Sequence, residues 1–322
     1  MLLLAEFQFS WLWLAEVLIA VMLYATLAAS LNLVTGYAGM FSLGHHGFFA
    51  VGAYAAGWFA TQFTGVAAGS VAGWAVFLGS AVFAALAAAA AGLLVGIPCL
   101  RLRGDYLAIA TLAFGEIVRI VIENSFALGR SEGLYVPRVL AEPKGMEEVA
   151  SFRNLSLGLG VALLVLTLVV IRNLIKSAHG RAIVSLREDE IASDLLGVRT
   201  TRYKVGAFAL GATFAGLAGC LYAHYSGSIA PQNFNLEVGI KILLIVVLGG
   251  FGSLSGTVIA AAVLIGFERL LMTGVFGPTW KEWMQVEYAV LLILLMLLRP
   301  NGIFGSRELS DVLRRRATGV VK

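Results

Sequence analysis

The sequence predicts an all-α fold, a polytopic bundle of about eight to ten transmembrane helices with short helices on its cytoplasmic side. Hydrophobic residues make up 59% of the 322-residue chain and charged residues only 13%, whereas soluble domains carry roughly 25% charged residues. Several apolar runs reach the ~20 residues that a helix needs to cross a bilayer. Charge is also concentrated, because residues 17–100 contain no Asp, Glu, Lys or Arg and residues 176–204 contain ten of them.

The apolar runs define nine candidate spans within a single domain, residues 1–322, since no linker rich in proline or serine divides the chain. The candidate at 238–250 has the length of a half-helix, and the one at 38–60 starts among glycines and is either a re-entrant segment or a full span. Irregular backbone at membrane depth is tolerated only where protein or a cavity surrounds it. In order, the candidates are 14–35, 38–60, 72–98, 105–124, 155–175, 204–223, 238–250, 254–273 and 284–298.

Lysine and arginine residues predict the orientation, because cytoplasmic loops are enriched in them. They gather in the turn at 101–103, in residues 176–204 and in the tail at 299–316. We therefore expect these three regions, and with them the C-terminus, in the cytoplasm. Nine spans then place the N-terminus and the 125–154 loop outside. The net charge of +4 follows from these clusters and predicts topology rather than a nucleic-acid partner.

Residues 176–204, which we call the cytoplasmic segment, carry their own helix signals. Ser185 and Glu188 have the spacing of a capping box, and Gly197 stands where a glycine ends a helix. The predicted helix is amphipathic, although a solvated connector between two spans is an alternative interpretation. Ile191, Ala192, Leu195 and Val198 share the face expected to rest on the membrane domain, and Glu190, Ser193, Asp194 and Gly197 share the face expected to meet a partner.

Polar residues inside the predicted spans are candidates for a substrate pathway, because ionisable groups in a bilayer are costly and often functional. Asn32, His45, His46 and Glu116 are these candidates. Neutral, hydrogen-bonded histidines that only pack helices, and a purely structural Glu116, are the alternatives.

Other intramembrane residues favour structural roles. Arg119 and Glu123 have the i, i+4 spacing of a structural ion pair, and Lys241 is expected to snorkel toward the interface. The glycines at 249–256 favour a tight cytoplasmic turn, with broken helices at a substrate pathway as the alternative. Small residues from Gly211 to Gly219 predict a helix–helix contact.

Patterns of catalysis and metal binding are missing from the sequence. It contains no HEXXH or GxSxG motif and no GxxxxGK[ST] phosphate-binding loop. The two cysteines define neither a disulfide framework nor a metal site. We expect no enzymatic activity, no bound metal and no ATPase site in this chain.

Four blocks of the sequence carry a family pattern. They are LNLVTGYAGMFSLGHHGFFAVGAYAAG at 31–57, RGDYLAIATLAFGEIVRIVIEN at 103–124, GRAIVSLREDEIASDLLGVRTTRYK at 180–204, and AFALGATFAGLAGCLYAHYSGSIAPQNFNLEVGIKILLIVVLGGFGSLSG at 207–256. These blocks resemble the permeases of branched-chain amino acid ATP-binding cassette (ABC) importers, specifically the M-type member of the permease pair. The FGE motif of the second block and the REDE motif of the third favour the M-type over its H-type partner.

The resemblance implies a permease in a bacterial cytoplasmic membrane that moves branched-chain or related amino acids by alternating access. It implies an H-type permease as partner, two cytoplasmic ATPase subunits that bind ATP and Mg²⁺, and an extracytoplasmic substrate-binding protein. No cofactor is implied for this chain. The cytoplasmic segment would couple to the ATPases through Arg181, Arg187, Glu188, Asp189, Glu190, Ser193, Asp194 and Gly197.

The sequence departs from the family pattern in two places. ABC permeases often carry Glu-Ala-Ala followed by Gly four residues later, but here Ile191-Ala192-Ser193 precedes Gly197 and the acid stands one position early. The outer loop reads Gly-Arg-Ser-Glu-Gly-Leu at 129–134 where the family often has Thr-Gly-Gly before Gly-Leu. A permease for another small solute, such as an amide or carboxylate, and an ion-coupled secondary transporter therefore stay as alternatives.

Overall fold

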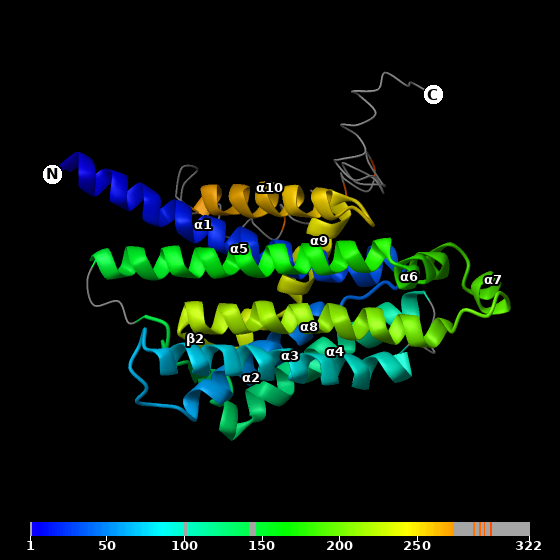
Figure 1. Ribbon diagram of the computed structural model, residues 1–322, viewed down its shortest axis with the longest axis horizontal. Coiled ribbons are helices and arrows are strands. Elements are labelled where there is room, and N and C mark those ends of the chain that lie inside the picture. Colours follow the sequence, from blue (N-terminus) through cyan, green and yellow to red (C-terminus); the bar gives the residue numbers. More distant parts are fainter. Residues whose placement is uncertain are drawn as a thin grey trace, which may run out of the picture.

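The computed structural model describes residues 2–99, 102, 104–141 and 146–272, and four single positions at 286, 290, 293 and 297. Long helices run alongside one another, and two short helices project from one end of the bundle (Figure 1). The long helices are α1 (Leu2–Asn32), α2 (His45–Thr61), α3 (Val71–Cys99), α4 (Asp105–Asn124), α5 (Met146–Lys176), α8 (Thr200–Ser226), α9 (Leu236–Gly249) and α10 (Leu254–Met272), and the projecting ones are α6 (Ala178–Glu188) and α7 (Glu190–Leu195).

Length and apolar composition qualify five stretches of the described chain as membrane spans. They are Trp11–Tyr37, Val71–Pro98, Glu148–Lys176, Thr200–Ser226 and Pro231–Gly249. Helix α2 is only 17 residues long and α4 carries intramembrane charges, yet both lie in the same bundle. The predicted all-α, polytopic fold is confirmed. The ninth candidate span, apart from its four single positions, and the basic tail at 299–316 lie outside the described residues.

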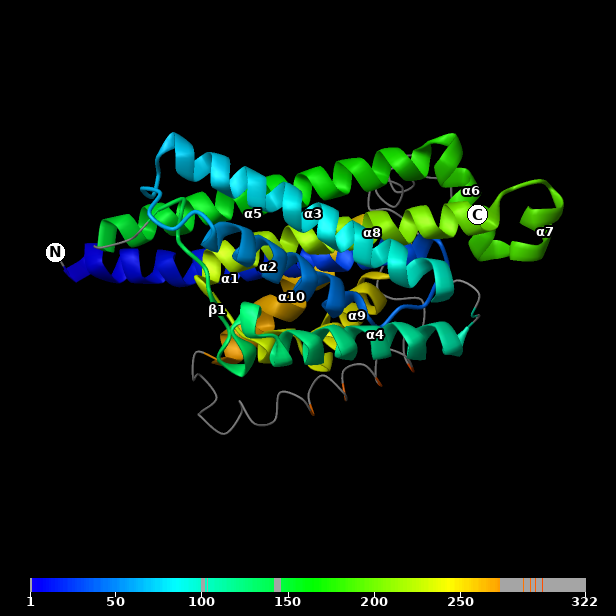
Figure 2. The ribbon, with the colours of Figure 1, turned by 90° about the horizontal axis from the view of Figure 1, so that it is seen from below.

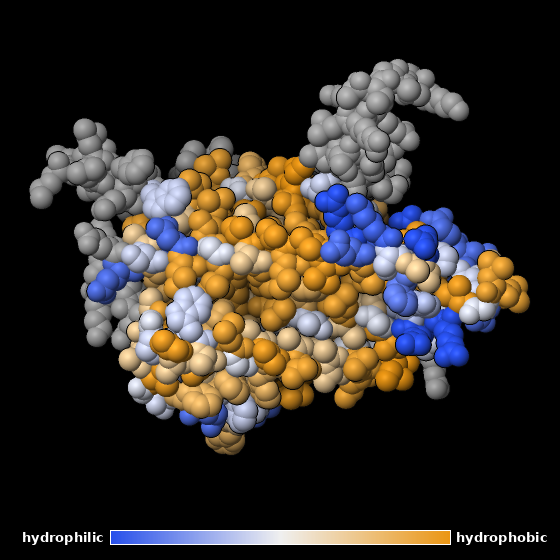
Figure 3. Space-filling model, in the orientation of Figure 1, coloured by the Kyte–Doolittle hydropathy of each residue, from blue (hydrophilic) through white to orange (hydrophobic). Residues whose placement is uncertain are grey.

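The surface supports a membrane setting. In Figure 3 a broad apolar area covers the middle of the bundle, and hydrophilic residues gather at the end that carries α6 and α7. The first turn of α1 lies at the opposite end (Figure 1). The N-terminal end of α1 and the cytoplasmic segment are therefore on opposite sides of the bundle, as the orientation derived from the basic residues predicts.

Small residues form the contact among α2, α3 and α8, where helix backbones come close together. A Cβ built on Gly216 of α8 would lie 2.4 Å from the Ala88 side chain of α3, and one built on Gly52 of α2 would lie 2.2 Å from the Gly216 backbone. A Cβ on Gly219 would meet the backbone of Phe49 at 2.4 Å. The predicted small-residue contact is present, and it sets the close approach of these helices.

Irregular segments join the helices at both ends. Residues 38–44 are not helical, so α2 starts at His45 rather than at 38. At the outer end, β1 (Leu134–Tyr135) pairs antiparallel with β2 (Ser228–Ile229), a pairing that the sequence patterns did not predict. Short helices flank these strands: η2 (Phe126–Leu128), η3 (Arg130–Glu132) and η4 (Pro231–Phe234). Figure 2 shows β1 far along the bundle from α7.

The turn between α9 and α10 is tight, as the glycines predict. Gly250 and Gly252 adopt φ values of 104° and 82°, a backbone region that favours glycine. This turn lies beside the last turn of α1, which continues as a π-helix, η1 (Leu33–Tyr37). π-helical turns are rare and often occur at functional sites.

Candidate functional site

The cytoplasmic segment folds as two helices rather than one. Ser177 caps α6, since its side chain accepts a hydrogen bond from Gly180 N. Asp189 then breaks the helix and caps α7, because its carboxylate accepts from Ile191 N at 2.9 Å and from Ala192 N at 3.0 Å. The predicted capping box was wrong: Ser185 lies inside α6 and donates to Ala182 O. Asp189 competes better for the start of α7 because one carboxylate binds two free amide groups.

The predicted end of the second helix is present. Gly197 has φ of 83°. Its amide donates to Asp194 O at 2.9 Å, and Val198 N donates to Ser193 O at 3.0 Å. These two bonds form a Schellman motif, which satisfies the last carbonyl groups of a helix.

The orientation of α7 differs from the prediction for both predicted faces, although Asp194 and Gly197 are exposed as predicted. Ser193 is 4% exposed and lies against the body of the protein, whereas Ile191 and Leu195 are 62% and 84% exposed. Glu190 also lies inward, where its carboxylate pairs with Lys204 of α8 at 2.6 Å. The reason is electrostatic: Lys204 is nearly buried, and a buried ammonium group needs a carboxylate partner.

The outward side of α7 is therefore apolar. Ile191 and Leu195 of α7 and Leu196, which follows it, form an exposed surface that we call the apolar tip. Leu196 is 85% exposed, and the apolar atoms of this tip stand out at the right of Figure 3, beyond the hydrophilic residues around them. Apolar patches with a polar rim are typical of surfaces that contact another protein or a membrane, so this tip is a candidate interaction site.

The charged residues of the segment divide into two groups. Arg181, Glu188 and Asp194 are exposed. Arg187 is exposed as well, but its guanidinium also makes an inward contact: Nη1 donates to Gly36 O of η1 at 2.9 Å, while Nη2 donates to Glu188 Oε1 at 2.9 Å. Arg187 therefore connects the cytoplasmic segment to the end of α1.

Asn32 continues this connection. Its Nδ2 donates to Ser253 O at 3.1 Å and to Thr257 Oγ1 at 2.8 Å, and its Oδ1 accepts from Gly252 N at 2.9 Å. The side chain is fully buried, and these bonds join α1 to the α9–α10 turn. The geometry gives Asn32 a structural contact at the end of the bundle that carries α6 and α7.

The two predicted pathway histidines have different surroundings. His45 is buried between α1 and α2, with its Nε2 2.7 Å from Ser30 Oγ. His46 donates from Nδ1 to Leu43 O at 3.1 Å, since a carbonyl oxygen only accepts. Its Nε2 is buried and makes no hydrogen bond within the described chain.

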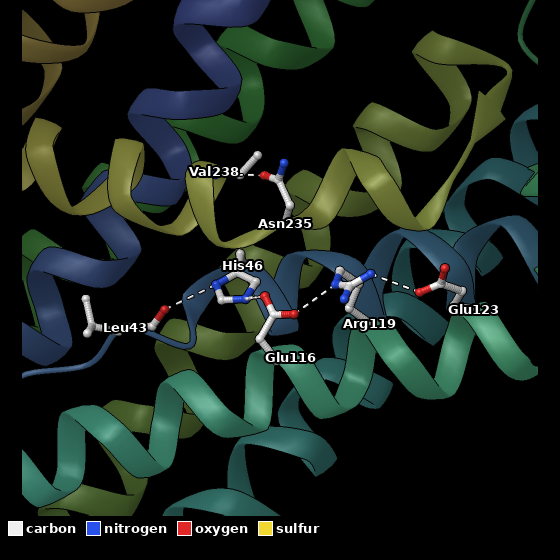
Figure 4. A network of polar contacts seen from close by, with 7 residues as sticks. All are labelled: Leu43, His46, Glu116, Arg119, Glu123, Asn235 and Val238. Atoms are coloured by element: carbon white, nitrogen blue, oxygen red, sulfur yellow. Dashed lines mark hydrogen bonds and ion pairs between the residues drawn. The ribbon is translucent and has the colours of Figure 1, made fainter. Parts of the chain in front are cut away.

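His46 lies next to a row of three charged side chains on α4: Glu116, Arg119 and Glu123 (Figure 4). Its Nε2 lies 3.8 Å from Glu116 Oε1. Arg119 bridges the next two carboxylates, with Nε 2.8 Å from Glu116 Oε2 and Nη1 2.9 Å from Glu123 Oε2. The predicted Arg119–Glu123 ion pair is thus present, and the same guanidinium also holds Glu116. We call Glu116, Arg119 and Glu123 the α4 strip.

Sequence reasoning missed a second intramembrane ion pair. Lys241 of α9 lies 2.9 Å from Glu268 of α10, and each side chain is only 9% exposed. The Lys241 ammonium also lies 5.5 Å from the centre of the Tyr24 ring. Lys241 does not snorkel, because a buried partner lies closer than the interface. Opposite charges in two consecutive predicted spans were the signal that would have found this pair.

No metal centre is formed by the described residues, in which no three His, Cys, Asp or Glu side chains group as ligands.

Together, an apolar bundle of spans, charged groups within it and a helical projection with an apolar tip define a membrane transport subunit. The chain matches the family model described as "Branched-chain amino acid transport system / permease component" over residues 13–299. It belongs to this permease family.

The proteins that are similar to this chain include permeases named LivM and permeases named LivH. It is 38% identical to the high-affinity branched-chain amino acid transport system permease protein LivM of Escherichia coli (strain K12), over 88% of this chain and 68% of LivM. It is 25% identical to the probable LivM of Methanocaldococcus jannaschii, over 89% of this chain and 92% of that protein. The match to LivH of E. coli is 35% identical but covers only 42% of each chain. No solved structure matches the chain. The match to LivM of E. coli covers 88% of this chain and the match to LivH covers 42%, which agrees with the resemblance to the M-type permease.

Proposed function

We propose that this protein is the M-type permease subunit of an ATP-driven importer for branched-chain amino acids. It pairs with an H-type permease, receives its solute from an extracytoplasmic binding protein and is driven by two cytoplasmic ATPase subunits that bind ATP and Mg²⁺. The branched-chain amino acid transport function of the LivM and LivH relatives supports the solute and the permease partner. The orientation of the basic residues supports a cytoplasmic C-terminus.

The apolar tip of α7 is the observation that carries the coupling part of the proposal. Three large apolar side chains stand in water at the tip of the projection, held outward by the inward-facing Glu190–Lys204 pair. Burying each of them against a partner contributes about 1.5 to 3 kcal/mol. An ATPase subunit that covers this tip would move it when ATP binds.

Arg187 and Asn32 give that movement a route into the bundle. Arg187 joins α6 to Gly36, and Asn32 joins the same end of α1 to the α9–α10 turn. Displacement of the cytoplasmic segment would therefore reach three spans at once. Alternating access follows if ATP and the loaded binding protein each favour a different arrangement of these spans.

An association experiment tests the coupling. Leu195→Asp places a charge in the apolar tip, and we expect the yield of the permease pair to stay unchanged because the side chain touches water. Pull-down of the ATPase subunits and ATP-dependent leucine uptake should both fall. Asp194→Asn is the matched control, since it changes the adjacent exposed residue without altering the tip. ATPase binding that survives Leu195→Asp would refute docking through the apolar tip, whatever the result for Asp194→Asn.

An energetic experiment tests the class of transporter. Leucine uptake by the reconstituted importer should require ATP and should continue after ionophores collapse proton and sodium gradients. Uptake that stops with the gradients while ATP is present would identify an ion-coupled transporter instead.

A further inference from the structure

The α4 strip occupies a position that lipid does not favour. Glu116 lies 11 residues from the start of α4 at Asp105, which is about 16 Å along a helix that rises 1.5 Å per residue. It therefore lies near the middle of the span, and Glu123 lies near its outer end. The three side chains are 26% to 34% exposed. Charges at this depth are costly in contact with lipid, so this face is expected to meet water or protein.

At the inner end of the strip, two hydrogen-bond acceptors, His46 Nε2 and Glu116 Oε1, face each other with no donor between them in the described residues. The Nδ1 proton of His46 is committed to Leu43 O, so in the neutral ring Nε2 is an acceptor. It faces the carboxylate oxygen Glu116 Oε1 at 3.8 Å, and the described residues supply no donor to it. Two glycines leave the space that the imidazole occupies: a Cβ built on Gly115 of α4 would lie 2.4 Å from Nε2, and one built on Gly239 of α9 would lie 2.6 Å from Nδ1. A ligand group with several N–H donors would satisfy both acceptors.

The centre of the strip retains donor capacity. Arg119 uses Nε and Nη1 for the two carboxylates, and within the described part of the chain its Nη2 makes no hydrogen bond. A guanidinium binds a carboxylate ligand well because its donors lie in one plane. Ile120, 48% exposed, stands one turn beyond Glu116 and offers apolar surface next to these charges.

We propose that the α4 strip, with His46 behind it, is a binding site for the zwitterionic head of the transported amino acid. The α-ammonium lies against Glu116 Oε1 and supplies the donor that His46 Nε2 lacks. The α-carboxylate takes the free edge of Arg119, and the side chain rests on Ile120. This inference rests on the proposed function, since it takes an amino acid as the solute.

The position of the strip suits a pathway from the outer side. Glu123 lies near the outer end of α4, close to the loop that precedes β1, and Glu116 lies near mid-span. A zwitterion that leaves the binding protein would meet the outer carboxylate first and then exchange partners along Arg119 to Glu116. Selection of free amino acids over amines or acids is the expected consequence, because each half of the zwitterion has its own partner.

The test measures uptake of L-leucine by the complete reconstituted importer. Arg119→Gln should lower uptake by at least roughly tenfold, the effect expected for loss of a charged hydrogen bond. Arg172→Gln removes an exposed arginine from α5 and is the matched control, which should leave uptake unchanged.

A charge reversal separates ligand binding from structural support. The triple variant Glu116→Arg, Arg119→Glu and Glu123→Arg keeps an opposite charge at each pair of neighbouring positions but reverses the sign of all three charges. We expect it to recover the thermal stability that Arg119→Gln loses, while leucine uptake stays at a tenth of the unchanged protein or below.

Two results would overturn the inference while leaving the proposed function intact. One is full uptake by the triple variant, which would make the strip a structural ion-pair network or a contact with the second permease. The other is unchanged uptake by Arg119→Gln. Failure of the proposed function would show differently, because the unchanged protein would then accumulate no leucine with ATP.

Discussion

The Lys241–Glu268 pair provides a quantitative test of the bundle. At 2.9 Å, the Coulomb attraction is about 6 kcal/mol at an effective dielectric constant of about 20. Desolvation of two nearly buried charges offsets most of it, at several kcal/mol for each ion. The net contribution of the pair is therefore small, but the loss of one partner leaves the other charge buried and uncompensated.

Lys241→Met should therefore destabilise the assembled permease pair by about 3 to 5 kcal/mol. Adding Glu268→Leu should recover most of this loss, because two apolar side chains replace two buried charges. The assay is unfolding of the assembled pair in mild detergent by titration with a denaturing detergent, followed by loss of helical signal. Lys176→Met, which removes an exposed lysine, is the control. A double variant that is less stable than Lys241→Met alone would refute this reasoning.

Two further predictions follow from backbone geometry. Gly216→Ala places a methyl group 2.4 Å from the Ala88 side chain and should therefore lower the yield of folded protein. Gly206→Ala is the control and should leave the yield unchanged, because a Cβ at Gly206 meets nothing within 4 Å. Equal yields for the two variants would contradict close packing at Gly216. Asp189→Ala removes the cap of α7 and should destabilise that helix by about 1 kcal/mol, measured as faster amide hydrogen exchange confined to residues 190–198; unchanged exchange there would contradict the capping role.

The end of α7 and the turn between α9 and α10 were predicted correctly from the sequence, because each depends on the conformation of one or two glycines. Gly197 ends α7, and the glycines at 250 and 252 form the tight turn, because backbone with positive φ angles favours glycine. The start of α7 was misplaced, since two overlapping signals competed and only Asp189 had both amides in reach. The candidate site was found in part: His46, Glu116, Arg119 and Glu123 were singled out, but their alignment in one row depends on how α2 packs against α4.

The sequence by itself determined that this protein is a polytopic helical membrane protein with its charge concentrated in one segment between two spans. Composition and apolar run length carry that information, because the bilayer requires it of every span. Tertiary structure alone decided which way α7 faces and what Lys241 pairs with. Periodicity tells which side chains share a face of a helix, but not what covers that face. Both outcomes depend on residues distant in sequence, Lys204 for Glu190 and Glu268 for Lys241, which approach only when the helices pack.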